Sequence, residues 1–355
     1  MSAPISSSSD VIDFVVHRGN GVTGLVQIGV ESVPDRYIQP REERLDPSKL
    51  ETQESIPIID FSNWADPKVA ESICDAASKW GFFQIVNHGV PLEVLEDLKN
   101  AARRFFELPG EERKKYLKEN SPSETVRLCT SFSPQAEEVL EWKDYLTLLW
   151  VSESEASAFW PPACRDQAIA YMKKAEVLIR RLLEVLLKRL HTKERDRTKE
   201  YMLMGELRLS LNYYPRCPSP ELTAGVGRHS DISTITVLLQ DETGGLYVRG
   251  AKEDTWIPVP PVKGALVVNI GDVLQIMSND LYKSIEHRAI ANRSRNRVSV
   301  PIFVNPGPDT IIGPLPEVLE SGEKPVYKHV TFADYFKHFF SKGHDGKNTI
   351  EFARI

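Results

Sequence analysis

The chain has 355 residues, 41% hydrophobic and 26% charged, the composition of an ordinary folded protein with a sizeable core. Its 44 basic and 50 acidic residues give a formal charge of −6, which excludes the broad positive surface of a nucleic-acid-binding protein. With 4 scattered cysteines, no membrane-spanning apolar run and no secretory signal, we expect a cytoplasmic protein that binds neither nucleic acid nor membrane.

The first half of the chain alternates between helical and strand patterns. Residues 1–55 show little periodicity, and we expect an extended N-terminal segment that wraps over a neighbouring surface. Beyond it we predict an N-terminal domain at 56–165 and linking helices at 166–205. Apolar spacing predicts buried strands at 56–61 and 81–90 and amphipathic helices at 66–79, 92–107 and 166–190.

After Met204 the pattern changes to short β-segments separated by turn-forming residues, with no helix predicted between them. These segments predict a sandwich, jelly roll or small barrel at 206–306. A C-terminal segment, 307–355, contains a predicted closing helix at 331–342. The expected fold class is therefore mixed α/β (α+β). The predicted strands cover 207–214, 233–239, 245–248, 256–259, 265–270, 284–290 and 298–304.

The β-rich region carries a possible metal site. His229 and Asp231 are two residues apart, so on a strand they would project from the same face. His287 sits mid-strand in a later predicted segment. Two imidazoles and one carboxylate form the set that binds iron(II) and leaves positions free for other ligands. Taken alone, a surface histidine beside a turn aspartate is the simpler interpretation.

Two further pairs surround that set. Arg297 and Ser299 share a face of the strand after His287, and a guanidinium beside a hydroxyl can receive a carboxylate. Asn212 and Tyr214 share a face of an earlier strand. Taken separately, Arg297 could form a surface ion pair and Tyr214 could simply pack in the sheet.

Together these motifs resemble the plant Fe(II)/2-oxoglutarate-dependent dioxygenases, from about Ile56 to Phe340. The resemblance implies a distorted double-stranded β-helix (jelly-roll) core, an N-terminal helical dioxygenase domain packed on it and a C-terminal helix. It implies that His229, Asp231 and His287 bind iron. Arg297 and Ser299 would hold the distal carboxylate of 2-oxoglutarate, with Tyr214 and Asn212 assisting. The motifs are NYYPRC (212–217), HSD (229–231), His287 and RVS (297–299).

The chain ends carry a closer resemblance. DFVVHRGNGVTGL (13–25) and FFSKGHDGKNTIEFARI (339–355) are similar to the hydroxycinnamoyl-CoA ortho-hydroxylases of coumarin biosynthesis. This implies a monomer that hydroxylates feruloyl-CoA or 4-coumaroyl-CoA, leading to scopoletin or umbelliferone. Fe(II), 2-oxoglutarate and dioxygen would be required, with ascorbate as reductant. Leu128-Cys129 departs from the family's usual Phe-Gly, so selectivity among ring substituents differs if that segment borders the substrate.

Several alternatives fit part of this pattern. Scopoletin 8-hydroxylases share GVGRHSD (225–231). Oxidases resembling isopenicillin-N synthase or aminocyclopropane-carboxylate oxidase have comparable iron ligands and an Arg-x-Ser pair. A noncatalytic jelly-roll binding module would need no iron. A zinc hydrolase on a cupin-like core would leave Arg297 and Ser299 unexplained.

Overall fold

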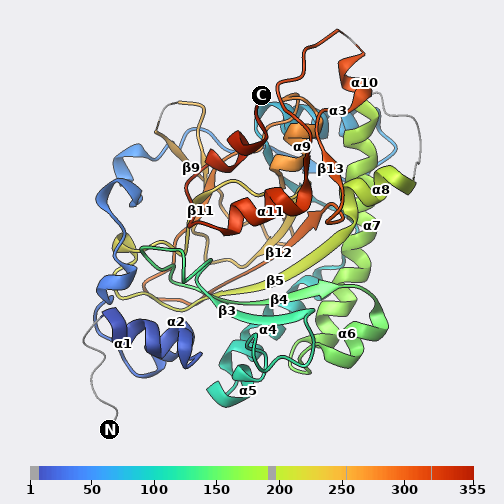
Figure 1. Cartoon of the computed structure of the whole chain (residues 1–355). Coiled ribbons are helices and arrows are strands. Elements are labelled where there is room, and N and C mark those ends of the chain that lie inside the picture. Colours follow the sequence, from blue (N-terminus) through green and yellow to red (C-terminus); the bar gives the residue numbers. More distant parts are fainter. Residues whose placement is uncertain (1–7, 191–196, 253, 321) are drawn as a thin grey trace.

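The computed structural model describes residues 8–190, 197–252, 254–320 and 322–355, and its core contains two main β-sheets (Figure 1). The large sheet has 8 strands, in the order β1-β2-β10-β7-β12-β5-β4-β3. Its strands are β1 (Ile58–Asp60), β2 (Phe82–Val86), β10 (Leu266–Ile270), β7 (Ile235–Gln240), β12 (Arg297–Asn305), β5 (Glu206–Tyr214), β4 (Asp144–Trp150) and β3 (Val126–Thr130).

The small sheet has 4 strands in the order β6-β11-β8-β9, namely β6 (Val226–His229), β11 (His287–Ala289), β8 (Leu246–Arg249) and β9 (Trp256–Pro258). A buried apolar cluster joins it to the large sheet, with Phe82 and Val267 from one sheet and Leu246 and Val248 from the other. A separate pair is formed by β13 (Ile311–Ile312) and β14 (Val330–Thr331). This two-sheet arrangement agrees with the expected jelly-roll core.

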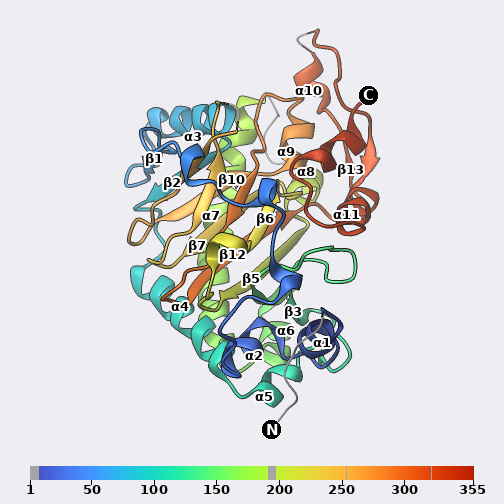
Figure 2. The ribbon, with the colours of Figure 1, turned by 90° about the vertical axis from the view of Figure 1, so that its left-hand side faces the viewer.

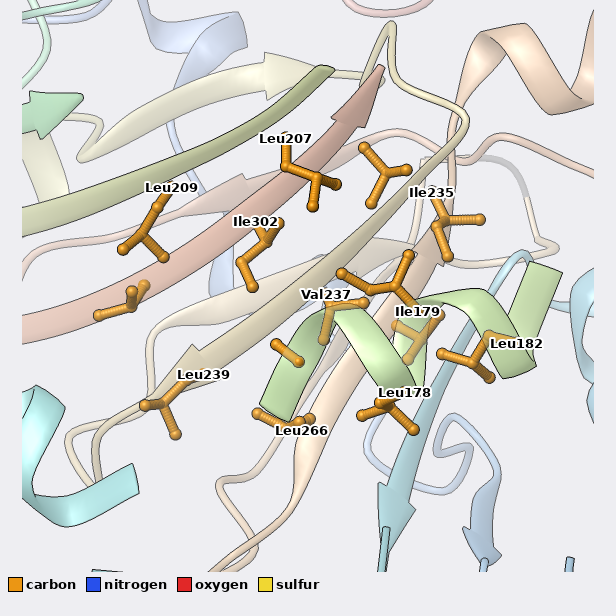
Figure 3. Packing of buried hydrophobic residues seen from close by; sticks show 14 of the residues in the cluster. Leu178, Ile179, Leu182, Leu207, Leu209, Ile235, Val237, Leu239, Leu266 and Ile302 are labelled. Atoms are coloured by element: carbon orange, nitrogen blue, oxygen red, sulfur yellow. The ribbon is translucent and has the colours of Figure 1, made fainter. Parts of the chain in front are cut away.

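Helices cover one face of the large sheet. Helix α4 (Leu92–Glu107) contacts β5 and β12, while α7 (Arg165–Arg189) packs on α4 and on α3 (Pro67–Lys79). Leu178 and Leu182 recur at helical spacing on α7 and point into the same apolar cluster as Val237 and Leu266 (Figure 3). Burial of this continuous cluster is the main driving force that fixes the helices to the sheet.

The opposite face of the large sheet is the one that builds the site. On β5, Leu207, Leu209 and Leu211 belong to the apolar cluster under the helices. Because side chains alternate along a strand, Ser210 and Asn212 face the other way. We call this second side the site face of the sheet.

The predicted helices and strands between Ile58 and Phe340 are all present, with shifts of a few residues at their ends. The expectation that no helix interrupts the β region was wrong. Helix α9 (Asp272–Met277) lies between β10 and β11, where no helix was predicted. It has only 6 residues, too few for a 3.6-residue apolar period to be recognised in the sequence.

The N-terminal segment is also not simply extended. It contains α1 (Ser8–Ile12), a π-helix (Asp13–His17) and α2 (Gly21–Gln27). The carboxylate of Asp144 on β4 accepts hydrogen bonds from the N–H groups of Val22 and Thr23, at 2.9 and 2.8 Å, and so caps α2 from another part of the chain. These short helices depend on such tertiary contacts, which explains their weak sequence signal.

The N-terminal domain is not only helical. It supplies β1 and β2 at one edge of the large sheet and β3 and β4 at the other edge. Figure 2 shows β1 and β2 on the opposite side of the sheet from β3. The predicted division at residues 55, 165, 205 and 306 stays a prediction, since one sheet contains strands from both sides of it.

The remaining helices are short. They are α5 (Gly110–Lys114), α6 (Glu153–Phe159), α8 (Arg197–Met204), α10 (Pro316–Leu319) and α11 (Phe332–Phe340), the last of which is the predicted closing helix. Within the part of the chain that the structure describes, no helix is both long and apolar enough to cross a membrane.

Candidate functional site

Two strands of the small sheet and one loop bring His229, Asp231 and His287 together. His229 ends β6 and pairs directly with His287, the first residue of the antiparallel strand β11. Asp231 follows two residues after β6. One ligand atom from each residue lies within 4.8 Å of the others. Asp231 Oδ1 is 3.4 Å from His229 Nε2 and 3.8 Å from His287 Nε2.

The local placement differs from the sequence expectation in two respects. Asp231 is not on the same strand as His229, because β6 ends at His229, and His287 begins its strand instead of lying in the middle. The backbone carbonyl of Asp231 accepts a hydrogen bond from the N–H of Asp272 at 2.7 Å, which turns the chain towards α9. The carboxylate therefore reaches the two imidazoles from a loop.

In each of the three side chains, the polar atom that faces away from the cluster forms hydrogen bonds with neighbouring residues. Asp231 Oδ2 accepts hydrogen bonds from Thr236 Oγ1 at 2.6 Å and from Asn269 Nδ2 at 2.8 Å. The Nδ1–H of His229 donates to the carbonyl of Gly227 at 2.8 Å. His287 Nδ1 faces the carbonyl of Ile285 at 3.3 Å in the same way. Two Nε2 lone pairs and Oδ1 are left for a metal, and this donor set fits iron(II).

The protonation states agree with that assignment. Burial by itself would raise the pKa of Asp231, but His287, His229 and the Thr236 hydrogen bond hold it below its ordinary value. Burial and the neighbouring His229 lower the pKa of His287 to about 4. At neutral pH the carboxylate is ionised and the imidazole is neutral, which are the forms that bind metals.

Arg297, the first residue of β12, is 1% exposed on the site face. Its Nε donates to the carbonyl of Gly244 at 2.5 Å and its Nη2 to Gln240 Oε1 at 3.3 Å. Its Nη1 is buried without a hydrogen-bond partner among the described residues. An unpaired buried donor of this kind is costly, and a carboxylate bound here would satisfy it.

The other three predicted residues surround this guanidinium. Its carbon lies 4.8 Å from the ring centroid of Tyr214, in a cation–π contact. Ser299 Oγ donates to the hydroxyl of Tyr214 at 3.5 Å, and Asn212 Nδ2 lies 3.5 Å from Ser299 Oγ. The arrangement offers a cation and hydroxyls to a small anion.

The two groups of residues lie on adjoining strands. Thr236 and Asn269, which hold Asp231, come from β7 and β10, and β12 with Arg297 is the next strand after β7. Thr236 pairs with Phe303 on β12, and Arg297 lies six residues before Phe303, so the two groups are offset by roughly 20 Å along the strands at the level of the backbone. The predicted iron ligands thus form one cluster over the site face, and the four predicted 2-oxoglutarate residues form a second cluster further along that face.

Sequence reasoning assigned no role to His344, which the structure places against the metal cluster. Its ring stacks on that of His229, with centroids 4.4 Å apart and planes at 18°. It also stacks on Phe132 at 3.9 Å. His344 Nδ1 lies 2.7 Å from Glu141 Oε1. Phe132, Glu141 and His344 lie outside the helices and strands, and His344 is about two hundred residues from the other two, so no periodic signal could have linked them.

Known proteins match the whole chain. The profile of the 2OG-Fe(II) oxygenase superfamily matches residues 205–306, and that of the non-haem dioxygenase in morphine synthesis N-terminal matches residues 56–163. A feruloyl CoA ortho-hydroxylase of Ipomoea batatas is 61% identical over 100% of both chains. Feruloyl CoA ortho-hydroxylase 1 of Arabidopsis thaliana is 57% identical over 100% of this chain and 99% of its own.

A bi-functional coumaroyl CoA and feruloyl CoA ortho-hydroxylase of Ruta graveolens is 56% identical, over 98% of this chain and 95% of its own. Among solved structures, JOX2 in complex with 2OG, Fe and JA has a TM-score of 0.81 at 36% identity, covering 94% of this chain and 97% of that chain. The resemblance inferred from the motifs is confirmed. This chain belongs to the 2OG-Fe(II) oxygenase superfamily and is a 2-oxoglutarate-dependent dioxygenase that uses Fe(II), 2-oxoglutarate and dioxygen.

Proposed function

We propose that this chain hydroxylates the aromatic ring of a hydroxycinnamoyl-CoA thioester at the carbon ortho to the side chain. The observation that carries the proposal is full-length identity of 56–61% to relatives named for ortho-hydroxylation of feruloyl CoA, or of coumaroyl CoA and feruloyl CoA. With feruloyl-CoA the product leads to scopoletin, and with 4-coumaroyl-CoA it leads to umbelliferone. Once the double bond has isomerised, the new phenol oxygen attacks the thioester carbonyl, and cleavage of the C–S bond releases coenzyme A as the thiol and closes the lactone.

In this proposal His229, Asp231 and His287 hold Fe(II). Fe(II) bound there would supply the activation of dioxygen, of which one atom enters succinate as 2-oxoglutarate loses carbon dioxide and the other enters the ring hydroxyl. The protein contributes fixed geometry. Because the Nδ1 atoms and Asp231 Oδ2 are already bonded, the three ligand atoms need no reorientation when the metal arrives.

Arg297, Ser299, Tyr214 and Asn212 hold the distal carboxylate of 2-oxoglutarate in this proposal. The unpaired Nη1 of Arg297 supports this role, since a carboxylate would give it a partner. The guanidinium is 1% exposed, so little water competes with the carboxylate for its N–H groups. Arg297 lies on the large sheet and the two histidines on the small sheet, so a cosubstrate held at Arg297 by its distal carboxylate would extend its keto acid end towards the iron ligands.

Substrate choice also involves the departure at Leu128-Cys129. Leu128 packs in the apolar cluster under the helices, so it faces away from the site. Cys129 pairs with Tyr145, which in turn pairs with Asn212, so Cys129 belongs to the site face. We propose that Cys129 is the member of this pair that can border the substrate.

We further propose that the protein acts as a monomer in the cytoplasm.

The test is to incubate the purified protein with Fe(II), ascorbate and 2-oxoglutarate, offering feruloyl-CoA, 4-coumaroyl-CoA and scopoletin separately. Formation of scopoletin or umbelliferone with about one succinate per product supports the proposal. An 8-hydroxylated product from scopoletin alone would assign the alternative activity. Dioxygen consumption without succinate would indicate an oxidase that needs no 2-oxoglutarate.

A further inference from the structure

His344 is a fixed part of the wall around the metal cluster. The N–H of Gly346 donates to the carbonyl of Arg228 at 3.0 Å, and the N–H of Ser230 donates to the carbonyl of Gly346 at 3.3 Å. These bonds join the C-terminal segment to β6 beside His229. The imidazole of His344 is 6% exposed and lies between the rings of His229 and Phe132.

Glu141 determines which nitrogen of His344 carries a proton. Glu141 Oε2 lies 3.1 Å from Lys143 Nζ, and Glu141 Oε1 also accepts the N–H of Gly227 at 2.7 Å. A carboxylate held in this way can only accept hydrogen bonds, so the Nδ1 of His344 must donate to it. In the neutral ring Nε2 is then a hydrogen-bond acceptor.

The direction of Nε2 follows from the stacking. The Nδ1 of His229 is bonded to the carbonyl of Gly227. The Nδ1 of His344 is bonded to the carboxylate of Glu141, and the same carboxylate accepts the N–H of Gly227. The two rings are only 18° from parallel. The Cβ and Nδ1 of His344 are among the atoms nearest to Gly227, and the Nδ1 of His229 is bonded to the Gly227 carbonyl, so both Nε2 atoms lie on the far side of their rings from Gly227.

His344 Nε2 is available for a ligand. No described residue forms a hydrogen bond with it, and the described metal-binding cluster contains only His229, Asp231 and His287. The ring of His344 stacks on the ring of His229, with 4.4 Å between the two centroids. It thus places an acceptor next to the proposed iron ligands without belonging to that set.

We propose that His344 positions the substrate by accepting a hydrogen bond at Nε2 from the phenolic hydroxyl of the hydroxycinnamoyl ring. The inference rests on the proposed function. In the aromatic half of such a substrate the phenol is the only hydrogen-bond donor, because the thioester carbonyl and any methoxy oxygen can only accept. His344 would thereby select rings with a free 4-hydroxyl group and fix which ring carbon faces the iron.

The experiment compares feruloyl-CoA with 3-methoxycinnamoyl-CoA, which lacks only the 4-hydroxyl, in the wild type and in His344→Phe. Phenylalanine keeps a flat ring between His229 and Phe132 but has no acceptor. Binding of both thioesters to the metal-free protein is measured by calorimetry, and kcat/KM and succinate per product are measured with the iron enzyme. We expect the wild type to prefer feruloyl-CoA about ten-fold in both measurements, and His344→Phe to lose that preference.

The matched control is His338→Phe. The ring of His338 stacks on Phe352, with centroids 4.7 Å apart, and has no contact with the ligand residues in the described structure. It should keep the wild-type preference. Thermal unfolding of each variant checks folding, and His344→Leu replaces His344→Phe if the latter does not fold.

Two results would overturn the inference. One is equal affinity of the wild type for both thioesters, and the other is an unchanged preference in a folded His344 variant. Either can occur while feruloyl-CoA is still hydroxylated, so the proposed function would survive. If the wild type hydroxylates no hydroxycinnamoyl-CoA at all, the proposed function itself fails.

Discussion

Thr236 holds Asp231 by the oxygen that faces away from the two imidazoles. The hydroxyl of Thr236 donates to Asp231 Oδ2 at 2.6 Å, and Asp231 Oδ1 is the oxygen near His229 and His287. Thr236 is on β7 of the large sheet, whereas the two histidines are on the small sheet. This hydrogen bond, together with the one from Asn269 on β10, links the metal cluster to the opposite layer of the core.

Thr236→Val keeps the shape of the side chain and removes this hydrogen bond. Because partners of metal ligands typically contribute 10–100-fold to metal affinity, we expect Fe(II) binding to weaken by about that factor. Anaerobic calorimetry measures it, and the exposed Thr52 provides the control Thr52→Val. Unchanged affinity would mean that Asn269 alone fixes the carboxylate.

Asp231→Ala removes the only carboxylate of the cluster. We expect iron content to fall from about one per chain to near zero, because two imidazoles alone make a poor iron(II) site. Metal analysis of anaerobically purified protein measures this, with Asp309→Ala at an exposed position as the control. Retained iron would show that the ion binds elsewhere.

Arg297→Lys tests the carboxylate site. Lysine keeps the charge but loses the planar fork, so we expect the KM for 2-oxoglutarate to rise about ten-fold with a smaller change in kcat. Arg293→Lys, at an exposed arginine that pairs with Glu221, serves as the control. An unaltered KM would place the distal carboxylate away from Arg297.

Glu137 should make stability depend on pH. Burial and the charge of Glu141 raise its pKa to about 7. The folded state therefore keeps a proton that the unfolded state has lost, and stability contributed by this group falls as pH rises from about 4.5 to 7. The slope is at most about 1.4 kcal/mol per pH unit.

Glu137→Gln removes this titration. We therefore expect the free energy of unfolding of the variant minus that of the wild type to be more positive at pH 8 than at pH 5. The measurement is urea unfolding at a series of pH values, with Glu138→Gln at the exposed neighbour as control. A difference between variant and wild type that does not vary with pH would contradict the raised pKa.

Leu182 on α7 tests the packing between helix and sheet. It is 0% exposed in the large apolar cluster (Figure 3), so we expect Leu182→Ala to cost about 2–5 kcal/mol of unfolding free energy. Val177→Ala, on the same helix but 57% exposed, should cost less than about 0.5 kcal/mol. Equal changes in unfolding free energy would mean that the packing of Leu182 against the sheet contributes little to stability.

The sequence was informative where local pattern decides structure. Regular apolar spacing located α4 and α7, and residues two apart on β5 and β12 correctly placed Asn212 with Tyr214 and Arg297 with Ser299. It failed where distant contacts decide. Helix α2 needs Asp144 as its cap, and the position of His344 depends on Glu141, more than a hundred residues away in each case.

The flanking strands of the large sheet have a consequence for dissecting this protein. β2 covers the edge of β10, and β4 covers the edge of β5. A fragment that starts at Glu206 would keep every proposed iron and 2-oxoglutarate residue. Without β2 and β4, however, the strands β10 and β5 would present unpaired backbone groups to solvent. Such edges recruit strands from other molecules. The shorter polypeptide should precipitate as aggregates, so a minimal enzyme must retain the preceding half.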